Sequence, residues 1–252
     1  YLGDEIDIHA GGEDLIFPHH ENEIAQSECC NDKIFARYWM HNGFLNINNQ
    51  KMSKSLGNFF TVREIGEKYD LQVLRFFMLS AHYRTPLNFS AELMDAAKSG
   101  LERVLTAVDN LKHLSGAAKT GHMTDEEKAA FSASEDFVKK FEAAMEDDAN
   151  TADAVSAVFE LVKFANSNTS SENSKEYLDA LYDRLNTLCG VLGIRVERKE
   201  EILDTEIEGL IAERQAARKE KNFARADEIR DLLLEKGIVL EDTREGVKWK
   251  RA

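Results

Sequence analysis

The hydrophobic positions of this sequence change period along the chain, from strand-like near the start to helical beyond residue 60. Residues 4–10 alternate loosely between apolar and polar and end at Gly11-Gly12. This period-two pattern predicts a strand that runs into a tight turn. Residues 35–50 are again rich in apolar and aromatic side chains, and they favour a strand or a hairpin.

The stretch between these two segments is predicted to be a helix. From His19 to about Cys29 the sequence contains neither Gly nor Pro. Pro18 precedes it at a first-turn position, where a missing N–H costs little. A strand followed by glycines and a helix is the geometry of a nucleotide site, although a glycine pair by itself is weak evidence.

Beyond residue 60 the apolar positions recur three or four apart, which predicts packed helices. Asn150 is the predicted N-cap of one of them, and Gly193 closes another as a C-cap. Residues 115–124 and 166–175 are small and polar, and we expect surface connections there. The apolar stripes are Leu71, Leu74 and Phe77 or Met78; Met94, Ala97, Leu101, Val104, Val108 and Leu111; Phe137 and Phe141; Val155, Val158, Phe159 and Val162; and Leu178, Leu181, Leu185, Leu188 and Leu192.

The end of the chain is predicted to form a separate small unit. Residues 195–204 are charged and weakly periodic, which is typical of a hinge. Two helical stripes follow, and then a strand at 238–240 and a last strand through Val247 and Trp249.

Composition bounds the functions that these elements can serve. The 252 residues are 43% apolar, enough for a real core, and the formal charge of −14 argues against indiscriminate nucleic-acid binding. Three cysteines, two of them adjacent, do not form a plausible disulfide framework. No apolar run approaches the ~20 residues that cross a bilayer. We therefore expect a soluble, cytoplasmic protein without a membrane partner, and, since the first residue is not Met, a fragment of something longer.

The strongest local signal for chemistry is the segment Lys51-Met52-Ser53-Lys54-Ser55, followed by Leu56-Gly57-Asn58. Two ammonium groups three residues apart, with hydroxyls between and a glycine behind, make a loop suited to phosphate. An exposed basic turn is the ordinary interpretation of a generic Lys-x-x-Lys. The complete five-residue string favours phosphate chemistry instead.

This string resembles the KMSKS signature of class I aminoacyl-tRNA synthetases. The upstream run Ile8-His9-Ala10-Gly11-Gly12-Glu13-Asp14 through His19-His20-Glu21-Asn22-Glu23 resembles the segment that precedes KMSKS in cysteinyl-tRNA synthetases. The resemblance implies a mostly α chain in three parts. These are the end of a Rossmann-type α/β catalytic domain (1–60), a helical bundle with a DALR-like region (61–200) and a small α+β anticodon-recognition unit (201–252).

The resemblance also implies roles for particular residues. Lys51 and Lys54 would stabilise the departing pyrophosphate of ATP, which such enzymes use with Mg²⁺. Gly11, Gly12 and Asp14 would contact the nucleotide, and His9 would be an active-site histidine. The HIGH-type motif of the family, which lies near the start of its catalytic domain, is not in this chain.

A zinc site is implied at the predicted helix. His19 and Glu23 are four apart and share one helix face, an arrangement that is usually only a surface pair. In the family these two positions bind Zn²⁺ together with two cysteines from farther upstream, which this chain does not contain. Cys29 and Cys30 lie outside the motif, and His20 is a poorer third candidate. Because zinc is thiophilic, such a site would select cysteine over serine or alanine.

The tail carries a second set of candidate residues. From Ala212 to Arg225 there are five basic residues against two acidic ones, and an exposed Phe beside Arg suits stacking on an unpaired base. The tail also resembles the anticodon-reading unit of bacterial cysteinyl-tRNA synthetases. That resemblance implies tRNA contacts by Arg218, Phe223, Asp227 and Asp242.

Three functions are compatible with these features. The first is ligation of cysteine to its tRNA by way of cysteinyl-adenylate, by a monomeric enzyme of which this chain is a fragment that is inactive when isolated. The second is a mycothiol-type cysteine ligase, which joins cysteine to an amino sugar and needs no anticodon unit. The third is an inactive piece that only binds tRNA.

Overall fold

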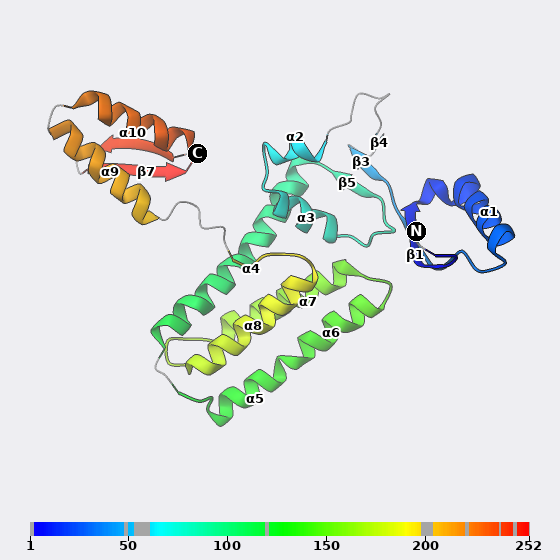
Figure 1. The fold of residues 1–252 in the computed structure, drawn as a ribbon. Coiled ribbons are helices and arrows are strands. Elements are labelled where there is room, and N and C mark those ends of the chain that lie inside the picture. Colours follow the sequence, from blue (N-terminus) through cyan, green and yellow to red (C-terminus); the bar gives the residue numbers. More distant parts are fainter. Residues whose placement is uncertain are drawn as a thin grey trace. The chain divides into compact units, whose positions relative to one another are not determined.

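The computed structural model describes residues 3–47, 50–52, 61–118, 121–197, 204–219, 222–236, 238–243 and 246–251. The chain divides into two compact units, residues 1–197 and residues 198–252. Most described residues are helical, with short strands at the start and at the end (Figure 1). The predicted fold class, mostly α with an α/β beginning, is confirmed.

The start of the first unit is a strand, helix and strand. The strands β1 (Ile6–Gly12) and β2 (Ala36–Asn42) pair in parallel. Two short helical turns, η1 (Glu13–Leu15) and η2 (Ile16–His20), and the helix α1 (Glu21–Asn31) join them. The predicted helix is therefore present, but it begins two residues later than expected, because Phe17 is extended and the chain is still turning at Pro18.

A second small sheet follows, with the strand order β4-β3-β5. The strand β3 (Leu45–Ile47) pairs antiparallel with β4 (Gln50–Lys51), which confirms the predicted hairpin, and parallel with β5 (Leu87–Phe89). The strand β5 was not predicted, because three residues are too few to show a period.

The rest of the first unit is a helical bundle with one hydrophobic core (Figure 1). Most residues of the predicted stripes are buried: Met94, Val108, Leu178, Leu181 and Leu185 have no exposed surface, whereas Leu71 is 50% exposed. The helices are α2 (Val62–Gly66), α3 (Leu71–Leu79), α4 (Ala91–Ala117), α5 (Asp125–Ala133), α6 (Glu135–Glu146), α7 (Thr151–Asn168) and α8 (Lys175–Val191).

The predicted helix ends are present. The Asn150 side chain accepts a hydrogen bond from the N–H of Asp153 at the start of α7, and Gly193 has a φ of +66° just after α8. The helix α5 was not predicted, because the residues that it turns toward the core, Glu127, Ala130 and Phe131, form no apolar stripe. Its start is fixed by a capping box between Thr124 and Glu127.

Glu127 is a buried carboxylate that joins two helix starts. Besides capping α5, it accepts hydrogen bonds from Asn173 and from the backbone N–H and hydroxyl of Ser174, which caps α8. Burial acts to raise its pKa, but these donors stabilise the charged form more strongly and lower the pKa to about 2.

Glu127→Gln is therefore expected to lower the free energy of unfolding of the bundle by roughly 2–3 kcal/mol at pH 7. Because the folded-state pKa is the lower one, this contribution is complete above pH 4.5 and is lost as the pH falls toward about 2. Denaturant unfolding of both proteins between pH 2 and 7 measures the difference. The exposed neighbour Glu126 provides the control Glu126→Gln, and an equal loss in that variant would contradict the assignment.

The second unit is a pair of helices and a pair of strands. Its elements are α9 (Asp204–Lys219), α10 (Phe223–Glu235), β6 (Ile238–Thr243) and β7 (Gly246–Arg251), with β6 and β7 antiparallel. Ile207, Ile229, Leu233 and Ile238 form its own core. Most of the predicted hinge, residues 198–203, lies outside the described residues.

Candidate functional site

The carboxyl ends of β1 and β2 bring together side chains from three segments. In the parallel register His9 lies opposite Trp39, and Gly11 lies opposite His41. Positions two apart along a strand face the same side. His9, Trp39 and His41 therefore share one face of the sheet, at the end where ligands bind in open α/β sheets.

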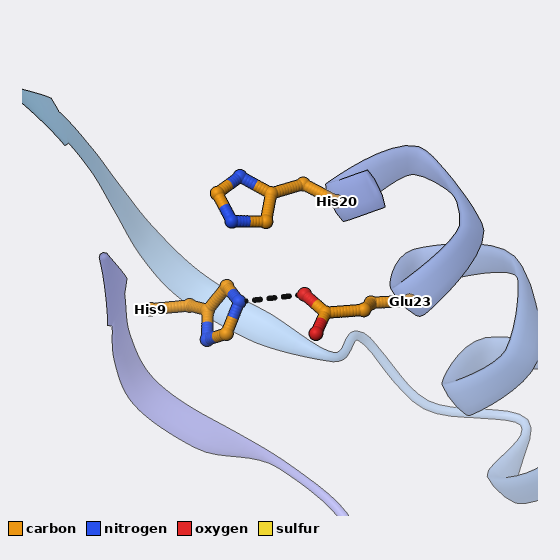
Figure 2. Close-up of side chains that lie close together, drawn as sticks. All are labelled: His9, His20 and Glu23. Carbon is orange, nitrogen blue, oxygen red and sulfur yellow. Dashed lines mark hydrogen bonds and ion pairs between the residues drawn. The ribbon is translucent and has the colours of Figure 1, made fainter. Parts of the chain in front are cut away.

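Glu23 connects this face to the helix that follows. Its Oε2 lies 2.7 Å from Nε2 of His9, and its Oε1 lies 3.2 Å from Nε2 of His19 (Figure 2 draws the His9 bond). Both carboxylate oxygens are thus engaged, one by a strand residue and one by the residue a helical turn before. The tertiary structure places His9 and His19, two predicted site residues, on the same acid.

His20 is the buried member of the group, with 3% of its surface exposed. Its Nδ1 lies 2.8 Å from Nε2 of His41, so one ring donates and the other accepts. Its ring also packs against His9 and Trp39, at centroid distances of 5.0 and 5.1 Å. Burial lowers the pKa of His20, and the nearby His41 and His9 lower it further. We expect His20 to be neutral at pH 7.

The pKa of Glu23 is also lowered. Its burial acts to raise the pKa, but the hydrogen bond from His9 and the charges of the nearby histidines outweigh that effect. Glu23 is therefore an anionic oxygen donor beside imidazole nitrogens, which is a suitable set for zinc.

The structure brings together a group of three possible metal ligands that differs from the pair His19 and Glu23 that the resemblance implied. Among the described residues, one atom each of His9, His20 and Glu23 lie within 4.8 Å of one another (Figure 2). His19 is not in this group, and its side chain is 60% exposed beside Glu23. The first set offers two imidazoles and a carboxylate, and the second offers one imidazole and a carboxylate. Either set has fewer donors than the four that tetrahedral zinc requires.

The space beside Gly11 and Gly12 is occupied by the protein's own side chains, which the sequence did not show. A Cβ at Gly11 would lie 2.9 Å from Cε1 of His20, and a Cβ at Gly12 would lie 2.5 Å from Oδ1 of Asp14. Gly11 leaves the space on the sheet face that His20 fills. The buried His20 ring thus explains Gly11, whereas the Asp14 carboxylate is the end of a flexible side chain and does not by itself require a glycine at position 12. Contact with a nucleotide stays a prediction for both glycines.

Two residues of this sheet face, Trp39 and His41, were not predicted as site residues from the sequence. Trp39 became a neighbour of His9, and His41 a neighbour of His20, only in the tertiary structure. The alternation of residues 39 and 41 in a predicted strand was the one available signal.

The predicted phosphate loop is only partly described. Lys51 ends β4, and the N–H of Met52 donates to the carbonyl of Leu45 at 3.1 Å. Lys54 lies outside the described residues. Cys29 and Cys30 are exposed near the end of α1 and are not members of the donor group.

The predicted RNA contacts of the tail lie near one end of its helix pair. The N–H of Asn222 donates to the carbonyl of Ala217 at 2.8 Å, and this bond makes a connection between the end of α9 and the start of α10. Arg218 precedes this connection and Phe223, 61% exposed, follows it. Asp227 is exposed one helical turn later, and Asp242 lies in β6 opposite Val247.

Not all of the predicted basic charge is available at this surface. Arg214 is buried, and Arg225 is held by Glu213 and Glu228, each at 3.0 Å. The excess of basic residues counted along the sequence therefore overstates the free positive charge.

Comparison with known proteins matches the chain in three parts. Residues 1–99 match the family of tRNA synthetases class I (C) catalytic domains, residues 140–197 match the DALR domain, and residues 201–249 match the cysteinyl-tRNA ligase anticodon binding domain. Over its whole length the chain is 69% identical to a cysteine–tRNA ligase of Lachnospira eligens, and 55% identical over 251 residues to that of Clostridioides difficile. It belongs to the cysteine–tRNA ligase family.

The chain spans about half the length of these relatives, 53% and 54% respectively. Solved structures at lower identity share the fold. A leucyl-tRNA synthetase from Agrobacterium radiobacter K84, in a complex with tRNA, is 16% identical with a TM-score of 0.63, over 75% of this chain and 26% of that one. A methionyl-tRNA synthetase from Mycobacterium tuberculosis is 18% identical with a TM-score of 0.51, over 75% and 40%. Within the described part of this family member, no helix has the length and apolarity to span a bilayer.

Proposed function

We propose that this chain is part of an enzyme that joins cysteine to its tRNA with ATP and Mg²⁺. The observation that carries the proposal is the similarity of the whole of this chain to cysteine–tRNA ligases. This similarity includes an anticodon-binding match at residues 201–249. That match favours tRNA over an amino sugar as the acceptor, and so disfavours the mycothiol-type alternative. We place the enzyme in the cytoplasm and expect a monomer.

The proposed reaction has two steps. The cysteine carboxylate attacks the α-phosphorus of ATP, the bond to the β-phosphate oxygen breaks, and pyrophosphate leaves. A hydroxyl of the terminal tRNA ribose then attacks the carbonyl of the cysteinyl-adenylate, and AMP leaves. Lys51 and Lys54 would stabilise the charge that develops on pyrophosphate, a contribution made in the transition state.

The residues around Glu23 would serve the amino acid. His19 and Glu23 would supply two ligands of a zinc ion, which when bound would recognise the substrate thiol as a ligand. His9 holds the second oxygen of Glu23 and so fixes the carboxylate. Gly11, Gly12 and Asp14, at the end of β1, would lie against the nucleotide.

A chimera tests this function. In it, the chain replaces the region that it matches in the Lachnospira eligens relative. We expect cysteine-dependent ATP–pyrophosphate exchange and charging of tRNA by the chimera, and neither by the 252-residue chain alone. Binding of tRNA by the chimera without any exchange would instead favour the RNA-binding alternative.

The anticodon unit makes a separate prediction in the chimera. Phe223→Ala is expected to weaken tRNA binding by about 1–3 kcal/mol through lost stacking on a base, whereas Phe223→Trp should be tolerated. Leu234, also on α10 and 58% exposed, provides the matched control Leu234→Ala. Filter binding of the cognate tRNA measures all three. Equal losses in the two alanine variants would show that Phe223 acts only as exposed apolar surface.

A further inference from the structure

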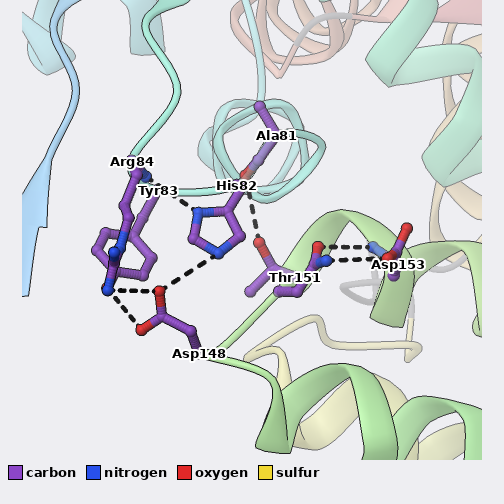
Figure 3. Close-up of polar contacts among 8 residues, drawn as sticks. Ala81, His82, Tyr83, Arg84, Asp148, Thr151 and Asp153 are labelled. Atoms are coloured by element: carbon purple, nitrogen blue, oxygen red, sulfur yellow. Dashed lines mark hydrogen bonds and ion pairs between the residues drawn. The ribbon is translucent and has the colours of Figure 1, made fainter.

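A polar cluster joins the helical bundle to the connection between α3 and β5. Asp148, in the turn between α6 and α7, accepts a hydrogen bond from the Tyr83 hydroxyl at 2.8 Å on one oxygen. Its other oxygen lies 2.7 Å from Nη2 of Arg84 and 3.7 Å from Nε2 of His82 (Figure 3). One carboxylate thus holds three consecutive side chains that are more than sixty residues away in sequence.

The three held residues also support one another. The rings of His82 and Tyr83 stack at a centroid distance of 4.8 Å, and Nε of Arg84 donates to the Tyr83 hydroxyl at 3.1 Å. Asp148 itself has a φ of +55°, and Ala149 has a φ of +53°. Two successive residues other than glycine in this region are unfavourable, so the turn is held in this conformation by its contacts.

From this cluster an unbroken series of backbone contacts leads to Lys51. The N–H of Gly43 donates to the carbonyl of Tyr83 at 2.8 Å, and the N–H of Leu87 donates to the carbonyl of Phe44 at 2.9 Å. A Cβ at Gly43 would lie 2.8 Å from the carbonyl oxygen of Arg84. The backbones are therefore in direct contact, and a shift at Arg84 must move Gly43.

The strand that begins just after Gly43 carries this contact onward. β3 is the central strand of its sheet, and in it Asn46 pairs with Lys51 of β4. The series therefore runs from Asp148 to Tyr83 and Arg84, then to Gly43, and along β3 to Lys51. Each step between segments is a hydrogen bond, an ion pair or a van der Waals contact.

From this series we infer that Asp148 is a positioning residue for Lys51. Asp148 would fix the backbone of Tyr83 and Arg84 against Gly43, and this contact would fix the positions of β3 and β4. Lys51, the first lysine of the proposed phosphate-binding pair, lies in β4 and would be positioned with them. This inference rests on the proposed function for its catalytic consequence, but not for its structural one.

Glycine substitutions distinguish the effect of losing the Asp148 carboxylate from the effect of changing the backbone of the α6–α7 turn. Asp148→Gly removes the carboxylate and suits the left-handed backbone, so the turn itself should be retained. Ala149→Gly makes the same backbone change next door and leaves the carboxylate in place. In the chimera we expect Asp148→Gly to lower kcat for ATP–pyrophosphate exchange about 10-fold with KM for cysteine unchanged. Ala149→Gly should match the wild type.

Amide hydrogen exchange of the 252-residue chain provides a readout that does not depend on activity. Asp148→Gly should speed exchange at Gly43, Leu87 and Met52 about 10-fold or more, while amides of α8 stay unchanged. Asp148→Asn keeps an acceptor for Tyr83 but loses the charge, so its exchange rates at these amides should lie between those of the wild type and those of Asp148→Gly.

Each outcome has a defined meaning. An unchanged kcat for Asp148→Gly in an active chimera, or an equal loss in Ala149→Gly, would overturn the inference. Unchanged amide exchange at Gly43 and Met52 would also overturn it. If the wild-type chimera shows no pyrophosphate exchange but Asp148→Gly loosens these amides, the proposed function fails while the structural link is supported.

Discussion

His19→Ala in the chimera is expected to abolish both stoichiometric zinc and cysteine-dependent pyrophosphate exchange. The imidazole of His19 and the carboxylate of Glu23, the two zinc ligands that we propose, lie 3.2 Å apart. Zinc needs four donors, so removal of one of two ligands from this helix should leave a site too weak to survive dialysis. Metal content by mass spectrometry, alongside exchange, measures the effect. Glu21→Ala, which removes a carboxylate from the same turn, is the control.

The structure offers a competing ligand set, and one further variant decides between them. If His9, His20 and Glu23 held the metal, His9→Ala would lose zinc and His19→Ala would keep it. We expect the reverse, with His9→Ala retaining zinc while slowing exchange. We also expect the 252-residue chain alone to hold no stoichiometric zinc. One tightly held ion per isolated chain would contradict this, and would implicate His20 or Cys29 and Cys30.

Lys54→Ala in the chimera is expected to slow pyrophosphate exchange about 100-fold or more, the effect of losing one preorganised electrostatic donor. Affinity for tRNA should change little, because the charge acts on the departing pyrophosphate. Lys33→Ala provides a matched control, since Lys33 is an exposed lysine whose ion pair with Asp4 is of a kind worth little. An exchange rate equal to that of the wild type would remove Lys54 from the mechanism.

The helices were predictable because the information that forms them is local. A stripe such as Met94, Leu101, Val104 and Val108 has the period of a helix whatever it packs against, and it is buried as expected. Asn150 begins α7 and Gly193 follows the end of α8, through a hydrogen bond and a backbone angle that involve only a few residues. The helix α5 was missed for the same reason, since its inward-facing residues, Glu127, Ala130 and Phe131, form no apolar stripe.

The sequence by itself also determined the family, because the K-M-S-K-S string and the His-His-Glu-Asn-Glu run are contiguous and specific. It named His9, His19 and Glu23 as candidates, but did not indicate that one carboxylate joins the two histidines. The sequence also predicted the helices of residues 61–200 and the basic stretch of residues 201–252. The free charge near Phe223, however, depended on which arginines fold inward.

Only the tertiary structure decided which distant residues meet. The parallel register of β1 and β2 places Trp39 beside His9 and His41 opposite Gly11, where the missing side chain leaves the space that His20 fills. Likewise, the α6–α7 turn meets Tyr83 and Arg84 across more than sixty residues. A strand's period shows which face a residue occupies, but not which strand lies beside it or in what register, because those depend on burial of the whole chain.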